Sequence, residues 1–267
     1  MSKARLDLDA YRKRVGYAGP LEPTAPVLEA LHLAHATHIP FENVDVLQKR
    51  PIRLDLASLQ AKLVAGGRGG YCFEQNLLFA AVLRAAGFDL TMLAARVRHR
   101  GDRALPRTHM ALLVRAGGSA WIADVGFGGE GLLLPVPFGV PGEVRHHAWT
   151  YRIVEEAAGQ WLLQSRREHG WGNLYSFTLE PQTLQDYEMA NHYTATHPDS
   201  PFVRMLIVQR PTPEARYLLK DGELVIDRGG GRVERRALAD DADVRSVLAD
   251  TFGLRFPAGT RFRGRDV

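Results

Sequence analysis

The spacing of apolar residues predicts helices over the first ninety or so residues. Thr24 is a candidate N-cap for a segment in which apolar residues recur at helical spacing until His38-Ile39-Pro40 stops it. Asp55 is a candidate cap for a second helix. A glycine-rich loop then runs through Cys72 into a third apolar helical segment, which Gly87 ends. Cys72 is therefore expected near a helix start.

Beyond Leu90 apolar and polar residues alternate with a period of two, which is typical of strands. The alternation is clearest over residues 108–115 and 121–125, and the segment 116–119 between them has the composition of a hairpin turn. Further strand-like runs cover residues 151–154, 160–165 and 174–179. The middle of the chain is expected to be mainly β, as an antiparallel barrel or sandwich.

The last part of the chain mixes both patterns. A hairpin is predicted around Asp221-Gly222, and an amphipathic helix near residues 240–252, with Val244 and Val247 on one face. This part is expected to form a small α/β appendage. The whole chain is therefore assigned to the α+β class.

Composition adds limits to this picture. Apolar residues make up 45% and charged residues 24% of 267 residues, as in an ordinary soluble globular protein. The net charge of +4 gives no argument for nucleic-acid binding. No apolar run approaches the length of a membrane span, and the first residues lack a secretory pattern. One cysteine excludes an intramolecular disulfide, and we expect a cytoplasmic protein without a membrane partner.

The position of Cys72 suggests chemistry. A helix start carries partial positive charge and free N–H groups, which favour a thiolate and can stabilise the oxyanion formed when a thiolate attacks a carbonyl. The preceding Gly69-Gly70 would let another molecule approach the backbone. The alternative is a small buried hydrophobic residue, the common role of a lone cysteine.

The predicted hairpin places a histidine near an aspartate. If the turn centres on Gly117-Gly118, the residue numbers of each opposed pair sum to 235. His109 and Asp124 are then diagonal neighbours on one face of the hairpin. Such neighbours lie about 7 to 8 Å apart, within side-chain reach. A hydrogen-bonded buried pair without catalytic role remains an alternative. The pattern alone does not bring Cys72 to them.

Five runs of the sequence together match one enzyme family. They are Ile39-Pro40-Phe41-Glu42-Asn43, Arg68-Gly69-Gly70-Tyr71-Cys72-Phe73-Glu74-Gln75-Asn76, Thr108-His109, Asp124-Val125-Gly126-Phe127-Gly128 and Tyr193-Thr194-Ala195-Thr196-His197-Pro198. In these runs the chain resembles the arylamine N-acetyltransferases. The similarity covers roughly the first 200 residues in order, and its most specific part surrounds Cys72.

The resemblance implies a helical bundle over residues 1–88, a β-barrel over 89–200 and an α/β lid over 201–267. It also implies a Cys-His-Asp triad, which falls on Cys72, His109 and Asp124. Acetyl-CoA would be the acyl-donor substrate, with no tightly bound cofactor and no metal, and an arylamine or hydrazine the acceptor. The implied reaction is ping-pong through an acetyl-cysteine.

The resemblance further implies contacts with the substrates. Phe41 and Phe127 would line the acceptor pocket, and Gly126 and Gly128 would leave room for the acetyl group and the pantetheine arm.

Two other functions fit parts of the pattern. A papain-like or transglutaminase-like cysteine hydrolase would use the same triad in the same chain order. A binding protein that keeps the fold without catalysis would have no physical need for all three residues.

Two further motifs lack the neighbours that their usual sites require. Residues 126–131 fit G-x-G-x-x-G, but residues 132–137 contain two prolines and cannot open the helix that a dinucleotide site needs. His32, His35 and His38 lie near one helical face, yet no Cys, Asp or Glu completes a metal set. We expect a surface or half-buried face there.

Overall fold

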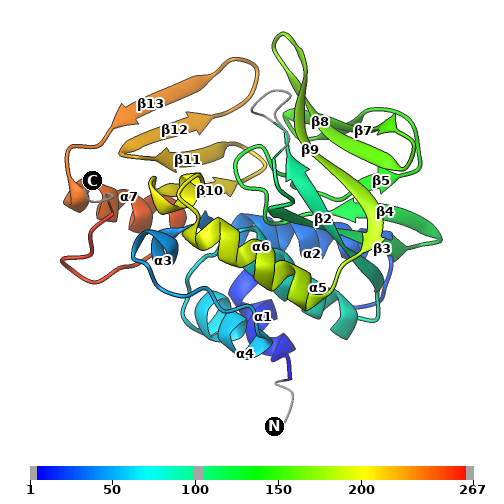
Figure 1. Cartoon of the computed structure of the whole chain (residues 1–267), viewed down its shortest axis with the longest axis horizontal. Coiled ribbons are helices and arrows are strands. Elements are labelled where there is room, and N and C mark those ends of the chain that lie inside the picture. Colours follow the sequence, from blue (N-terminus) through cyan, green and yellow to red (C-terminus); the bar gives the residue numbers. More distant parts are fainter. Residues whose placement is uncertain (1–4, 99–104, 263–267) are drawn as a thin grey trace.

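The computed structural model describes residues 5–98 and 105–262. Within them, the α-helices are α1 (Leu8–Val15), α2 (Ala25–His38), α3 (Val44–Leu47), α4 (Leu56–Leu59), α5 (Cys72–Ala85), α6 (Leu184–Thr196) and α7 (Asp241–Phe252). A π-helical segment, Gln60–Ala65, and a 3-10 segment, Pro201–Val203, complete the helical elements of this part. Figure 1 shows the helices between and below two sheets.

The first helices follow the apolar pattern. Helix α2 begins directly after Thr24 and ends at His38, before the Pro40 that cannot continue it. The Asp55 side chain caps α4 by accepting from the N–H of Ser58 at 3.0 Å. Beyond α4 the same helix continues with π-type hydrogen bonds over Gln60–Ala65, a change of pitch that apolar spacing does not reveal.

The middle of the chain forms an eight-stranded antiparallel sheet that curls into a nearly closed barrel (Figure 1). Its strands are β2 (Asp89–Val97), β3 (His109–Ala116), β4 (Ser119–Ala123), β5 (Val136–Phe138), β6 (Val144–His146), β7 (Trp149–Ala157), β8 (Gln160–Arg167) and β9 (Gly170–Pro181). They are ordered β5-β4-β3-β2-β9-β8-β7-β6. The expected α+β class with a central barrel is confirmed.

The hairpin of β3 and β4 has the predicted register. Leu112 pairs with Ala123 and Arg115 with Ala120, so that opposed residues sum to 235. Gly117 and Gly118 make the two-residue turn with φ of 58° and 78°, a conformation in which only glycine is unstrained at both positions. The face of Asp124 relative to His109 is therefore set by this turn.

A second, five-stranded sheet contains β1 (Phe41–Glu42), β10 (Ile207–Pro211), β11 (Arg216–Lys220), β12 (Glu223–Asp227) and β13 (Val233–Ala237). The predicted hairpin at Asp221-Gly222 joins β11 to β12, and the predicted C-terminal helix is α7. Strand β1 comes from the N-terminal part and pairs with β10, which the local pattern did not predict. This pairing ties the sheet to the helices.

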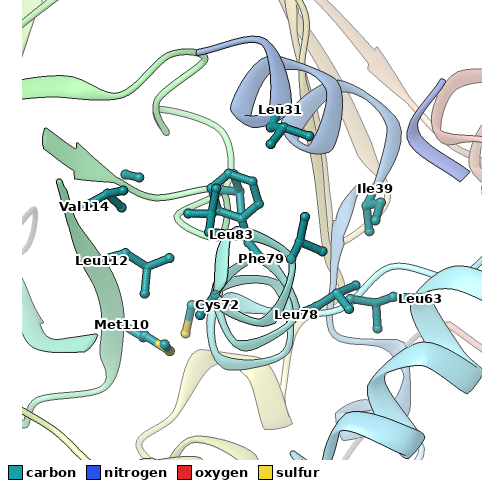
Figure 2. Close-up of a cluster of buried hydrophobic side chains, with 14 of the residues drawn as sticks. Leu31, Ile39, Leu63, Cys72, Leu78, Phe79, Leu83, Met110, Leu112 and Val114 are labelled. Carbon is teal, nitrogen blue, oxygen red and sulfur yellow. The ribbon is translucent and has the colours of Figure 1, made fainter. Parts of the chain in front are cut away.

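Three clusters of buried apolar residues hold the fold together. One joins the helices to one face of β2 and β3, and Figure 2 shows Cys72 within it next to Met110. The second fills the barrel, and the third lies between β10, β11, β12 and α7. Tyr187 of α6 belongs to the helical cluster and Val44 to the third, so each cluster draws on distant parts of the chain.

Candidate active site

Cys72 is the first residue of α5, as expected, and its side chain is buried. The glycines before it face protein rather than open space. A Cβ on Gly69 would lie 2.1 Å from the carbonyl oxygen of Pro40, and one on Gly70 would lie 2.7 Å from Glu74 Oε2. The expectation that these glycines admit another molecule is wrong, because the loop itself packs against β1 and α5.

Ion pairs fix this loop. Glu74 Oε2 accepts from the N–H of Tyr71, and its Oε1 accepts from Lys62 Nζ at 2.7 Å. Burial raises the pKa of Glu74 to about 7, although the Lys62 charge acts in the opposite direction. Arg68 donates to the buried carboxylate of Glu42 at 2.6 Å. These pairs anchor the backbone from which Cys72 emerges.

His109 and Asp124 form the pair that the hairpin predicted. His109 Nε2 and Asp124 Oδ2 are 2.7 Å apart, and both side chains are buried. Asp124 Oδ1 accepts from Asn76 Nδ2 and from the N–H of Gly126, each at 2.9 Å. Burial acts to raise the pKa of Asp124, but the His109 charge and these hydrogen bonds outweigh it and lower the pKa. Asp124 is therefore an ionised acceptor.

The environment of the Cys72 sulfur differs from the expectation. Burial raises the pKa of the thiol and the Asp124 charge raises it further, whereas the N–H groups of Phe73 and Met110 act to lower it. Sγ donates to the carbonyl oxygen of Thr108 at 3.6 Å. Burial of the sulfur thus acts against the lowering of the thiol pKa that a helix start favours.

Cys72 and His109 open into one cavity of about 460 Å³. Phe41, Gly126 and Phe127 also line it, at the positions proposed for substrate contact. The ring of Phe127 packs edge-on against His109, with centroids 5.2 Å apart. The cavity therefore combines a thiol, an imidazole and apolar aromatic walls.

The two glycines of the loop after β4 have different neighbours. A Cβ on Gly126 would lie 2.8 Å from Cys72 Cα, so that only glycine lets this strand end pass the helix start. Gly128 lies outside the large cavity, against a small adjoining hollow. The φ of Gly128 is +91°, and a Cβ on this residue would collide with Oε1 of Gln209. The same oxygen accepts a hydrogen bond from the N–H of Gly129 at 2.7 Å.

Several polar residues at the site were not assigned from the sequence. Asn76 holds Asp124, Gln209 holds the loop that carries Phe127, and His32 contacts the backbone of Asp124. Asn76 and Gln209 had no local signal, whereas His32 belonged to the histidine series. The expectation of a surface or half-buried face is wrong for His32 and His35, which are fully buried, and only His38 is exposed.

Other site classes receive no support from the described part of the chain. No group of three His, Cys, Asp or Glu side chains in residues 5–98 and 105–262 is placed to hold a metal ion. Over the same residues no helix has the length and apolar character that crossing a bilayer requires. Residues 126–131 lead into β5 rather than a helix, so that no dinucleotide-binding βαβ unit is formed.

Comparison with known proteins shows to which class of enzyme the chain is related. Residues 24–260 match the family model described as N-acetyltransferase. An arylamine N-acetyltransferase of Escherichia coli is 40% identical over 92% of this chain and 88% of its own. The crystal structure of the Nocardia farcinica arylamine N-acetyltransferase superposes with a TM-score of 0.89 at 38% identity, covering 96% of this chain and 92% of that one.

A third relative was solved with a ligand. The arylamine N-acetyltransferase of Mycobacterium marinum in complex with CoA has a TM-score of 0.87 at 34% identity, with 92% of each chain covered. Since the family model and these relatives span most of the chain, the chain belongs to the arylamine N-acetyltransferase family. It is an acetyltransferase, and the resemblance found in the sequence is confirmed.

Proposed function

We propose that this protein transfers an acetyl group from acetyl-CoA to an arylamine or arylhydrazine, through an acetyl-cysteine at Cys72. One observation carries the proposal: the Cys72 thiol opens into the same cavity as His109, whose other ring nitrogen is held by Asp124. A thiol, a base and a group that orients the base are the parts of a nucleophilic acyl transfer. The CoA complex of the Mycobacterium marinum relative supports acetyl-CoA as donor.

In the first half-reaction His109 acts as general base. Nδ1 of His109, the ring nitrogen that Asp124 does not hold, takes the proton of Cys72, and the sulfur attacks the thioester carbonyl. The new S–C bond leaves an oxyanion, which the N–H groups close to the sulfur would stabilise. Collapse breaks the bond to the CoA sulfur, which leaves with the proton from His109.

In the second half-reaction the amine replaces CoA. Its nitrogen attacks the acetyl-cysteine carbonyl, and His109 accepts the amine proton. Collapse breaks the S–C bond, and the Cys72 sulfur regains that proton. The aromatic walls, which include Phe41, Phe127 and Phe202, suit a flat aromatic acceptor. An arylamine is weakly basic, so that it keeps a free lone pair at neutral pH.

The proposal keeps the division into residues 1–88, 89–200 and 201–267, with the last part as a lid. Separate apolar clusters in the barrel and in the second sheet support it. Gln209 on β10 also accepts from the N–H of Gly129, in the loop that brings Phe127 to the cavity, which suits a part that covers the site.

The decisive experiment is the intact mass after incubation with acetyl-CoA alone. We expect a gain of one acetyl group, its removal when an arylamine is added, and no gain in Cys72→Ala. The Cys72→Ala variant should fold normally, because the change removes one sulfur atom. An unmodified mass while Cys72 still reacts with iodoacetamide would reject the transferase mechanism and favour the cysteine hydrolase, which peptide cleavage would then identify.

A further inference from the structure

The buried imidazole of His32 forms hydrogen bonds with both ends of the loop that begins at Asp124. This loop, residues 124–133, joins β4 to β5 and contributes Gly126 and Phe127 to the cavity. At its start the N–H of Asp124 donates to His32 Nε2 at 3.1 Å. At its end the carbonyl oxygen of Leu133 lies 3.0 Å from His32 Nδ1. His32 thus bridges both ends of the loop from helix α2.

These two contacts specify the state of the imidazole. Nε2 accepts from a backbone N–H, so it carries a lone pair, and Nδ1 must carry the proton that the Leu133 carbonyl accepts. His32 is fully buried, and burial lowers its pKa to about 4. A neutral His32 with its proton on Nδ1 matches both partners. A positively charged ring would also carry a proton on Nε2, which would face the N–H of Asp124.

The contact bears on the catalytic pair because it acts on the residue that orients His109. The side chain of Asp124 has its own partners, namely His109, Asn76 and Gly126. Its backbone N–H lies beyond the last β3–β4 pair, Leu112 with Ala123, so that the ladder does not hold it. His32 supplies the hydrogen bond that the sheet leaves unmade.

We infer that His32 is a positioning residue, whose bond to the Asp124 backbone aims the carboxylate at His109. The inference rests on the proposed role of Asp124 in acetyl transfer. His32 is not among the residues that line the substrate cavity, so its effect passes through the loop that it bridges, and the bond to Asp124 is the contact that leads to His109.

Two amide substitutions separate the two contacts. In His32→Gln the terminal amide reaches the place of Nε2 and can accept from Asp124, whereas in His32→Asn the shorter amide reaches the place of Nδ1 and can donate only to Leu133. We expect His32→Asn to lower the rate of single-turnover acetylation about tenfold, the factor that one lost buried hydrogen bond represents. His32→Gln should retain most of the rate.

The matched control is Leu28→Ala, which removes a fully buried side chain from the preceding turn of α2. It should lower the unfolding midpoint as much as the His32 variants do, without changing the pH profile of Cys72 alkylation by iodoacetamide. In His32→Asn that profile should shift to higher pH, because His109 is oriented less well. If His32→Asn does not fold, His32→Met, which fills the volume without either polar atom, replaces it.

The outcomes are distinct. Equal acetylation rates in His32→Gln and His32→Asn, or an alkylation profile in the Asn or Met variant that coincides with the wild type, would overturn the positioning role. A ring nitrogen spectrum that places the proton of His32 on Nε2 at pH 7 would also overturn it. A failure of the proposed function would be seen in a different measurement, as an unchanged mass of the wild-type protein after incubation with acetyl-CoA. The alkylation profile and the ring nitrogen spectrum would still test the role of His32 in that case.

Discussion

Replacing Asp124 by asparagine should move a proton on His109. Two donors, Asn76 Nδ2 and the N–H of Gly126, approach Oδ1 at 2.9 Å. An asparagine must therefore keep its oxygen on that side, because its NH₂ group would otherwise face two donors. The NH₂ group then points at His109 Nε2, which has to present a lone pair.

The magnitude follows from this change of tautomer. With Nε2 unprotonated, the neutral ring carries its proton on Nδ1, so that Nδ1 no longer accepts the proton of Cys72. Wrong-tautomer histidines in catalytic triads lower kcat on the order of 10⁴-fold. The variant is isosteric and keeps the hydrogen bonds at Oδ1, so its fold should be retained. We expect acetylation to fall about 10⁴-fold with an unfolding midpoint close to that of the wild type.

The assay is single-turnover acetylation, followed by mass, beside Cys72 alkylation by iodoacetamide as a function of pH. Asp250→Asn is the control, because Asp250 is an exposed aspartate on α7. That control should acetylate like the wild type. An Asp124→Asn protein that is folded and acetylates within tenfold of the wild type would refute the reasoning, since it would show that His109 does not depend on this partner for its tautomer.

Two further predictions concern stability. Gly128→Ala should lower the free energy of unfolding by about 1 to 3 kcal/mol more than Gly159→Ala does. Both positions have positive φ, but only a Cβ at position 128 collides with Gln209. Equal urea midpoints for the two variants would contradict this. His35→Gln should flatten the pH dependence of stability between pH 6.5 and 4. Burial lowers the pKa of His35 to about 3, so that on acidification the unfolded chain binds a proton at this histidine before the folded protein does. The free energy of unfolding therefore decreases by about 1.4 kcal/mol for each unit by which the pH is lowered in this range. Urea unfolding at several pH values measures the slope, and His38→Gln, at an exposed position, should leave it unchanged; an unaltered slope in the His35 variant would show that the site does not titrate as argued.

Much of the fold was predictable because its signals are local. The N-cap of α2 at Thr24, the start of α5 at Cys72 and the Gly117-Gly118 turn each depend on residues within one turn of the chain. The register of β3 and β4 follows from that turn alone, and with it the pairing of His109 with Asp124. Such features need no knowledge of distant contacts.

Desolvation could not be predicted in the same way. The helix start argued for an acidic thiol, but the burial that raises the pKa of Cys72 comes from packing against β3 and the helical core. Burial of His32 and His35 likewise depends on what covers α2. The expectation that Gly69 and Gly70 admit another molecule failed for the same reason, because Pro40 and Glu74 lie beside them.

The sequence by itself determined the candidate groups for the proposed chemistry: one cysteine at a helix start, and a histidine and an aspartate paired by a two-residue turn. Only the tertiary structure decided that Cys72 and His109 share a cavity, with Asp124 hydrogen-bonded to His109. It also decided that β1 joins the second sheet, and that His32, Asn76 and Gln209 contact Asp124 or the loop that follows it. The physical reason is range. Helix caps and turns are set by neighbours along the chain, whereas burial, charge and long-range hydrogen bonds depend on residues that only packing brings together.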